Sequence, residues 1–324
     1  MSALRCPLLL AGALLLAPVP LAAQDAGRDP FQDLALRSTI GMRYWYSQSN
    51  FLVELEQVDR TDVSRLEFAD VDQHSAELFF RLDDVSTDTF LKGTLGIGRT
   101  NSGSLDDEDY FASGTKFSDT YSTLDARTVG YLTLDAGWRF ANTADARTRA
   151  GLFAGYQYIR DDYVARGVRC NADEVGGAFC GAPGETVIPF SVKAIRNAVY
   201  WHVMRVGFEA EFELTKKLSL AAETSAVPFI YYENEDSHYL RSGIGAIPNF
   251  EDKGRQGYGV EAEAFLNYAV TDRFSVGLGG RYWWLRTKDT VAISAAQLPA
   301  YRGMGYSANT LERYGAVGQA SYRF

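Results

Sequence analysis

Hydrophobic and polar side chains alternate along several long segments of this chain. Between residues 273 and 285 (RFSVGLGGRYWWL) one face carries Phe, Val, Leu, Tyr and Trp, and the other carries Ser, Gly and Arg. The segments 258–270 and 205–214 repeat this alternation, with Glu on the polar face. Successive side chains of a β-strand point to opposite faces, so the pattern predicts strands with one apolar and one polar face. A soluble sandwich would alternate in the same way, but Tyr and Trp at the strand ends favour a membrane interface.

The pattern predicts ten strands, at 37–49, 74–84, 88–101, 127–140, 147–163, 196–213, 217–234, 256–270, 272–288 and 310–324. Short turns between them alternate with long polar loops at 50–73, 102–126, 164–195, 235–255 and 289–309. An even number of strands with this alternation is typical of bacterial outer-membrane proteins. We therefore expect an all-β fold, a ten-stranded antiparallel transmembrane β-barrel with long extracellular loops and short periplasmic turns. It forms one domain over residues 24–324.

The polar faces of the predicted strands carry charges of both signs. These residues are Arg43, Glu77, Arg81, Asp135, Arg139, Arg149, Arg205, Glu209, Glu211, Glu261, Glu263, Arg281 and Arg323. A ten-stranded barrel is narrow, and unpaired charges in a confined space are costly. We expect a lumen filled by paired side chains and water, with a diffusion pore as the alternative.

The N-terminal segment and the overall charge narrow the class of protein. An apolar run from Leu8 to Ala17 follows Arg5, and small residues precede Gln24, which predicts a secretory signal peptide over residues 1–23. The run is shorter than the ~20 residues that span a bilayer as a helix, and no second run of that length follows. Acidic residues outnumber basic ones by 41 to 32, which argues against a nucleic-acid partner.

Cysteine and histidine are scarce in the predicted mature chain. Cys170 and Cys180 enclose nine residues, and in an oxidising compartment they are expected to form a disulfide. Two free thiols are the alternative. The three histidines have no His or Cys partner at ligand spacing, so we expect no metal site.

Two short polar motifs carry residues suited to hydrolysis. Asp236 and His238 are two residues apart just past the seventh predicted strand, at the rim of a loop, so they share one side of an extended chain. An acid beside an imidazole fixes its tautomer and holds it as a general base. Asp107 and Asp109, beyond the third strand, form a carboxylate pair by the same spacing. Strands three and seven nearly face each other in a ring of ten, so the two motifs could hold one water between them. The alternative for each motif is a solvated acidic loop.

Arg160 shares its predicted face with Tyr156 and Tyr158. This places a cation on the lipid side of the barrel, above an aromatic belt, where a lipopolysaccharide phosphate would lie. Arg binds phosphate through two parallel hydrogen bonds. The alternative is an arginine that extends to the membrane rim to reach water.

Three of these segments resemble those of the omptin family of outer-membrane endopeptidases. SLDDEDY at 104–110 is similar to the family's Asp-x-Asp segment, NEDSHY at 234–239 to its Asp-x-His-Tyr segment, and AGYQYIR at 154–160 to its Ala-Gly-Tyr-Gln-x-x-Arg strand. The resemblance implies that Asp107 and Asp109 form one catalytic pair and that Asp236 and His238 activate the nucleophilic water. It also implies that lipopolysaccharide is an activating lipid held by Tyr156 and Arg160.

The resemblance is incomplete at two positions. Omptins that cleave between basic residues carry an acid two positions before the dyad aspartate, where this chain has Asn234, and another near the top of strand one, where it has Ser47 to Asn50. We therefore expect a weak or absent preference for Arg or Lys before the cut, with Glu54, Glu233 or Glu235 as alternative sources of the missing acid.

Two classes of function follow from the sequence. The first is an endopeptidase of the bacterial outer membrane that cleaves peptides or proteins outside the cell with an Asp/His-activated water and no cofactor besides lipopolysaccharide. The second is a non-catalytic barrel that acts as an adhesin, a receptor or a narrow channel.

Overall fold

The computed structural model describes residues 36–57, 62–111, 113–142, 147–241, 246–294 and 304–324. The predicted signal peptide lies outside these ranges. Thirteen strands are described: β1 (Leu36–Gln57), β2 (Asp62–Asp84), β3 (Thr89–Tyr110), β4 (Lys116–Leu124), β5 (Thr128–Asn142), β6 (Thr148–Asp173), β7 (Thr186–Glu213), β8 (Leu218–His238), β9 (Phe250–Gly254), β10 (Gly257–Ala269), β11 (Phe274–Thr287), β12 (Val291–Ser294) and β13 (Met304–Arg323). No helix among the described residues is long and apolar enough to cross a membrane.

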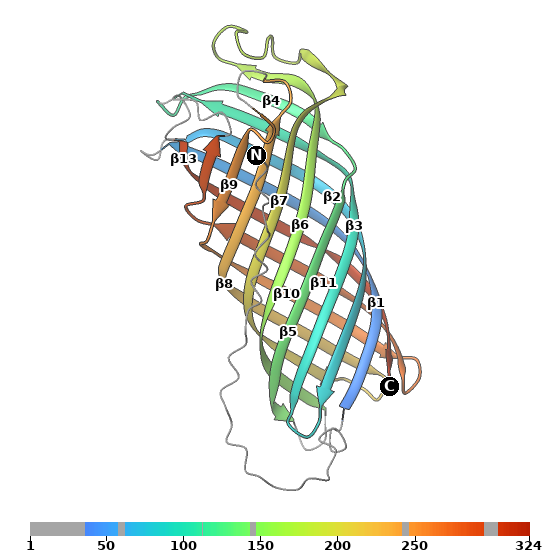
Figure 1. The fold of residues 1–324 in the computed structure, drawn as a ribbon. Helices are drawn as coiled ribbons and strands as arrows, with labels where there is room; N and C mark the ends of the chain where they lie inside the picture. Colours follow the sequence, from blue (N-terminus) through green and yellow to red (C-terminus); the bar gives the residue numbers. More distant parts are fainter. Residues whose placement is uncertain (1–35, 58–61, 112, 143–146, 242–245, 295–303) are drawn as a thin grey trace, which may run out of the picture. The chain divides into compact units, whose positions relative to one another are not determined.

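Ten of these strands pair into a closed antiparallel ring. The order is β1, β2, β3, β5, β6, β7, β8, β10, β11 and β13, and β13 then pairs with β1. Thr39 lies opposite Arg323 where the first and last strands meet. Closure leaves no strand edge in the ring with unpaired backbone groups, which a bilayer would not tolerate. The ten-stranded antiparallel barrel predicted from the alternation is therefore confirmed (Figure 1).

The outer face of the ring is apolar where it meets lipid. Large aliphatic side chains are exposed there, including Met42, Leu95, Ile97, Leu152 and Leu278, which is 68% exposed. Exposed Tyr44 and Tyr258 lie toward the loop end of the same face, as in the aromatic belts of membrane proteins. Exposure of this much apolar surface is favourable only in lipid.

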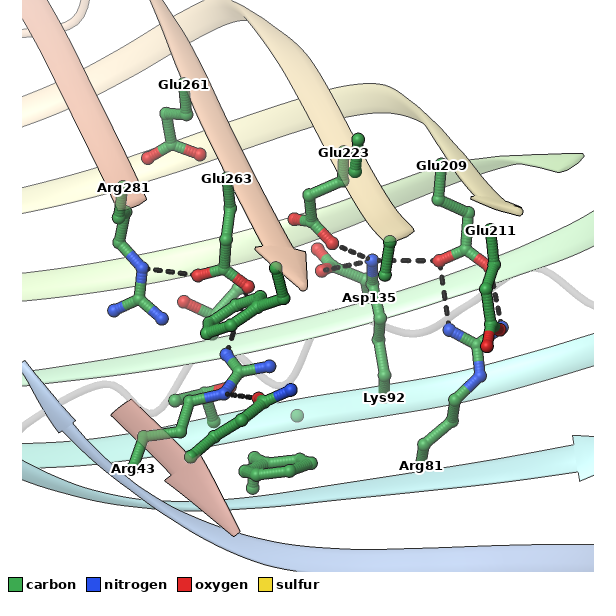
Figure 2. A pocket seen from close by; sticks show the side chains of 18 of the residues that line it. Arg43, Arg81, Lys92, Asp135, Glu209, Glu211, Glu223, Glu261, Glu263 and Arg281 are labelled. Atoms are coloured by element: carbon green, nitrogen blue, oxygen red, sulfur yellow. Dashed lines mark hydrogen bonds and ion pairs between the residues drawn. The ribbon is translucent and has the colours of Figure 1, made fainter. Parts of the chain in front are cut away.

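Ion pairs fill the lumen of the ring (Figure 2). Arg281 contacts Glu77 and Glu263, both at 2.5 Å, while Lys92 contacts Glu223 at 2.5 Å. Arg205 completes this network with Asp135, Glu223 and Glu261. A cavity of about 240 Å³ remains among these side chains. The expected plug of paired charges is thus present, and pairing offsets much of the cost of removing the charges from water.

A layer of aromatic side chains lies between the charged lumen and the loop end of the barrel. Trp45, Phe51, Tyr163 and Trp201 are fully buried on the inner face. Phe51 stacks on Tyr163 at 5.2 Å between ring centroids, and Trp201 packs edge-on against Tyr232 at 4.6 Å. Rigid aromatic packing beneath the mouth supports the upper ends of β6, β7 and β8.

The strands continue further toward the loops than the alternation predicts. β3 runs to Tyr110 and β8 to His238, while β4, β9 and β12 lie in segments expected to be loops. β1 and β2 likewise extend into 50–73, β6 and β7 into 164–195, and β13 into 289–309, so the predicted boundaries of all five long loops are wrong. Above the bilayer the outer face meets water instead of lipid, so its side chains need not be apolar and the alternating pattern ends. Backbone pairing between the strands does not depend on that pattern and continues beyond it.

Candidate active site

Asp236 and His238 form a hydrogen-bonded dyad at the end of β8. His238 Nε2 lies 3.0 Å from Asp236 Oδ2, and both side chains are on the inner face of the strand. The backbone N–H of His238 donates to Asn249 Oδ1 at 2.6 Å, and that of Asn249 donates to the carbonyl of Asp236 at 2.8 Å. Asn249, which directly precedes β9, thus fixes the backbone of the dyad. With Nε2 donating to the carboxylate, Nδ1 is left as the basic nitrogen.

Asp107 and Asp109 lie on the inner face of β3, and Asp107 is only 8% exposed. The hairpin partner β4 pairs with this part of β3 and holds it in the sheet. The sequence expectation of a loop here is wrong, but the two carboxylates still share one face because the chain is extended. Burial and the charge of Asp109 raise the pKa of Asp107 to about 7.

The two motifs act on each other across the mouth of the barrel. The positive charge of His238 lowers the pKa of Asp107, and the negative charge of Asp236 raises it. Burial by itself lowers the pKa of His238, but Asp236 and Asp107 outweigh it and raise that pKa above its ordinary value. β3 and β8 are not neighbours in the ring, so these couplings come from side chains that point inward from different walls. The structure thus brings the four residues singled out in the sequence into one space.

A chain of amides extends from the dyad to a further carboxylate, Asp252. Asn197 Nδ2 donates to Asp236 Oδ1 at 3.3 Å, and Asn234 Nδ2 donates to Asn197 Oδ1 at 2.7 Å and to Asp252 Oδ2 at 3.4 Å. Asp252 is 5% exposed and lies on β9, opposite Asn234 on β8. Burial and the charge of Asp236 raise the pKa of Asp252 to about 7. The site therefore holds an acid beside Asn234, and it comes from β9 rather than from the flanking Glu233 or Glu235.

Sequence reasoning missed Asp252 and a second residue, Arg241. Arg241 Nη2 lies 3.4 Å from Asp109 Oδ2, which links the segment after β8 to β3. Both residues belong to the stretch 235–255, which has no periodic pattern. Only the pairing of β9 with β8 brings Asp252 to the site. The one available signal was the position of Arg241, three residues beyond His238.

Tyr156 and Arg160 lie on the outer face of β6, as the alternation predicts. Tyr156 Oη is 2.6 Å from His202 Nδ1 on β7, and the Arg160 guanidinium lies over the Tyr200 ring at 5.7 Å. Arg160 is exposed. Its charge is thus available at the upper edge of the aromatic belt, and contact with lipopolysaccharide stays a prediction.

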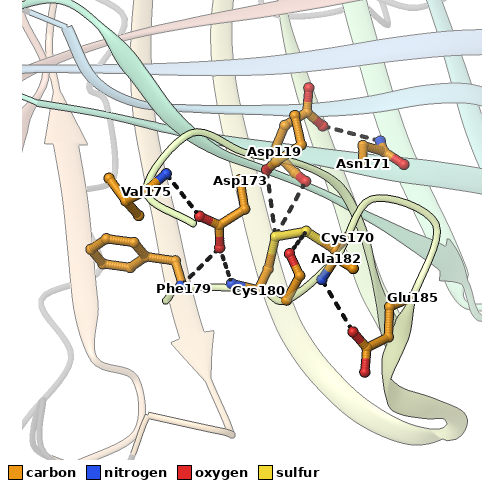
Figure 3. The surroundings of a disulfide bond; sticks show 11 residues. Asp119, Cys170, Asn171, Asp173, Val175, Phe179, Cys180, Ala182 and Glu185 are labelled. Atoms are coloured by element: carbon orange, nitrogen blue, oxygen red, sulfur yellow. Dashed lines mark hydrogen bonds between the residues drawn. A yellow bond between two sulfur atoms is a disulfide. The ribbon is translucent and has the colours of Figure 1, made fainter. Parts of the chain in front are cut away.

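A disulfide joins Cys170, near the end of β6, to Cys180 in the connection that leads to β7 (Figure 3). The carboxylate of Asp173, the last residue of β6, accepts hydrogen bonds from the backbone N–H groups of Cys180, Phe179 and Val175. These bonds lower the pKa of Asp173 to about 2. Among the described residues, Asp173, Cys170 and Cys180 are the one group whose potential metal-ligating atoms lie close together. The sulfur atoms of the two cysteines, however, are bonded to each other.

Comparison with solved structures supports the fold. The outer-membrane protease OmpT from Escherichia coli matches with a TM-score of 0.68 and 16% identity, over 89% of this chain and 96% of that chain. A FadL homologue from Pseudomonas aeruginosa and the toluene transporter TbuX from Ralstonia pickettii match over 89% of this chain, with 90% and 89% of theirs covered. Both are 9% identical to it, and their TM-scores of 0.30 and 0.31 are too low to support an argument.

Comparison by sequence identifies the family. No curated protein matches the chain significantly. The sequence model of the Omptin family matches residues 79–292, which is more than half of the chain and includes the acid pair, the dyad and Arg160. The chain therefore belongs to the omptin family, and its barrel is that of a bacterial outer-membrane protein.

Proposed function

We propose that the protein is an endopeptidase that cleaves peptides or proteins at the outer mouth of its barrel. The observation that carries this proposal is the hydrogen-bonded dyad of Asp236 and His238 on the inner face of β8, which Arg241 links to the acid pair on the inner face of β3 through its contact with Asp109. A buried carboxyl with a raised pKa facing an acid-supported imidazole is an arrangement suited to proton transfer. The family and the OmpT-like fold agree with a protease at the outer membrane.

In the proposed mechanism, His238 is the general base. Its Nδ1 takes a proton from water as the water oxygen attacks the scissile carbonyl carbon, and Asp236 stabilises the imidazolium that forms. His238 then gives the proton to the leaving amine as the C–N bond breaks. Asp107 and Asp109 orient the water from the opposite wall. Because the pKa of Asp107 is about 7, Asp107 can hold a proton near neutral pH, so the pair avoids two adjacent full charges.

We also propose that lipopolysaccharide supports activity through the outer face of β6. Arg160 offers a guanidinium to a lipid phosphate, and Tyr156 lies beside it on the same face. Tyr156 also contacts His202 on β7, so a lipid bound here would bear on two neighbouring strands. Toward the loop end, β6 pairs with the part of β7 that contains Asn197, and this part of β7 pairs with the end of β8 that carries the dyad.

A narrow channel is disfavoured by the interior of the barrel. The lumen is occupied by ion pairs, and fully buried aromatic side chains lie above them. Adhesin or receptor activity remains the alternative that a lack of cleavage would support.

The proposal is tested by digestion of a peptide library with the purified protein, folded in detergent micelles that contain lipopolysaccharide. We expect cleavage by the wild-type protein and none above background by His238→Ala. The same digestion measures the preference before the cut, which the sequence predicts to be weak for Arg and Lys. A folded barrel changes its electrophoretic mobility when it is heated before electrophoresis, so this heat-dependent gel shift serves as the control for folding. A folded wild-type protein that cleaves no peptide would refute the proposal.

A further inference from the structure

The proposed active site gathers four carboxyl groups. Asp107 and Asp109 face the dyad from β3, and Asp236 and Asp252 lie on its own side. Attack of water on a peptide carbonyl places a further negative charge on the carbonyl oxygen. Enzymes stabilise this charge with fixed hydrogen-bond donors or cations, and the benefit grows in a site with little water. Protonated His238 supplies one positive charge, but it must also serve as the proton carrier.

Arg241 brings a second positive charge to the same space. Its guanidinium reaches Asp109 at 3.4 Å from the segment that follows His238 by three residues. This segment is fixed to β7, because the backbone N–H of Tyr239 donates to the carbonyl of Ala194 at 2.9 Å. The charge of Arg241 lowers the pKa of Asp107 and of His238, so it acts on both halves of the site.

The guanidinium of Arg241 retains free hydrogen-bonding capacity. Its side chain is 49% exposed, and the contact with Asp109 is long for a charged hydrogen bond. Arg carries five N–H donors, so a single contact of this kind leaves several of them able to bind another oxygen.

Two cations on the extended parts of β2 and β4 are held differently. Arg65 contacts Glu67 at 2.7 Å and Glu108 at 3.5 Å, while Lys116 contacts Glu108 at 3.0 Å and Asp119 at 2.8 Å. Their partners are outside the acid pair and the dyad. Arg241 differs because its partner is itself a member of the acid pair.

We propose that Arg241 is a catalytic residue that donates hydrogen bonds to the scissile carbonyl oxygen as this oxygen becomes an oxyanion. The inference rests on the proposed endopeptidase activity. In the step concerned, the bond between water oxygen and carbonyl carbon forms, the carbonyl π electrons move to the oxygen, and the water proton passes to His238. Arg241 transfers no proton. When the C–N bond breaks, the electrons return to the carbonyl and the amine takes the proton from His238. Asp109 holds the guanidinium in place before the substrate binds.

The test compares Arg241→Ala, Arg241→Lys and the matched control Arg65→Ala on one cleaved peptide. Arg65 is also a rim arginine that contacts β3, through Glu108. We expect Arg241→Ala to lower kcat by roughly 10²- to 10³-fold with a much smaller change in KM, as for loss of one oxyanion donor. Arg241→Lys should retain part of the activity, and added guanidinium ion should partly restore Arg241→Ala. Arg65→Ala should cleave at nearly the wild-type rate.

A second readout separates catalysis from a structural role. Because Arg241 lowers the pKa of His238, its removal should shift the acid limb of the pH–kcat profile to higher pH. If the wild-type protein cleaves, His238→Ala does not, and Arg241→Ala matches Arg65→Ala in kcat and pH profile, the inference about Arg241 is wrong and the proposed function stands. If the folded wild-type protein cleaves nothing, the proposed function fails and the inference fails with it.

Discussion

The substitution Asp252→Asn should stabilise the barrel in alkaline solution and have little effect in acid. Asp252 is buried, and its pKa is about 7 in the folded protein against an ordinary value of 3.8. A carboxyl with a raised folded pKa holds its proton more tightly in the folded state. The folded state therefore loses stability as pH rises from the ordinary value through about 7. Asn is neutral at every pH and keeps the shape of the side chain, so it removes this loss.

The size of the effect follows from the two pKa values. Each pKa unit corresponds to about 1.4 kcal/mol, so the ionised Asp252 costs on the order of 4 kcal/mol at pH 9 as an upper bound. At pH 5 the folded carboxyl is protonated while the unfolded one is already largely ionised, so roughly 1.6 kcal/mol of this cost remains. We therefore expect the gain in the free energy of unfolding from Asp252→Asn to be roughly 2 to 3 kcal/mol larger at pH 9 than at pH 5.

The assay is urea unfolding in lipopolysaccharide-containing micelles, followed by tryptophan fluorescence and by the heat-dependent gel shift. Glu251→Gln is the matched control, since Glu251 is the neighbouring residue on β9 and is 45% exposed beside Lys253. It should show little difference between the two pH values. An Asp252→Asn protein with the same change in unfolding free energy at both pH values would refute the assigned burial and coupling of Asp252 to Asp236.

Three further expectations concern the dyad, the lipid face and the loops. Asp236→Asn should leave the gel shift intact but lower kcat by roughly 10²- to 10⁴-fold, because the tautomer and orientation of His238 are lost; near-normal kcat would show that Asp236 has no such role. Arg160→Ala should raise the lipopolysaccharide concentration needed for half-maximal activity, whereas an unchanged titration would remove Arg160 from the lipid site. A tag near residue 175 should be labelled on intact cells, and a tag within 141–146 should not. The opposite labelling result would mean that the barrel has the opposite orientation in the membrane.

The alternation of the sequence was sufficient to predict the barrel because lipid requires an apolar outer face. Leu278 and Ile97 are exposed on that face, and Arg281 and Glu77 pair inside it. The inner partners were only partly predictable. Glu223 was missed because the register between β7 and β8 shifts near Met204, so the inward phase of β8 changes along its length.

The acid pair and the dyad could be predicted as same-face pairs because their spacing of two residues fits an extended chain. Their placement at the ends of β3 and β8, rather than in loops, could not be predicted, because the outer face above the membrane has no apolar periodicity. Asp252 and Arg241 were inaccessible to sequence reasoning for another reason. Each reaches the site through a tertiary contact, to Asn234 in one case and to Asp109 in the other.

The most direct test of the proposed mechanism is the rate of peptide cleavage by His238→Ala relative to wild type, in the presence of lipopolysaccharide. His74→Ala is the matched control, because His74 lies on the outer face of β2 and contacts Tyr44. We predict that His238→Ala lowers kcat/KM by roughly 10²- to 10⁴-fold, as expected for loss of a general base, while His74→Ala and the gel shift of both variants stay close to wild type. Cleavage by folded His238→Ala at nearly the wild-type rate would contradict the mechanism.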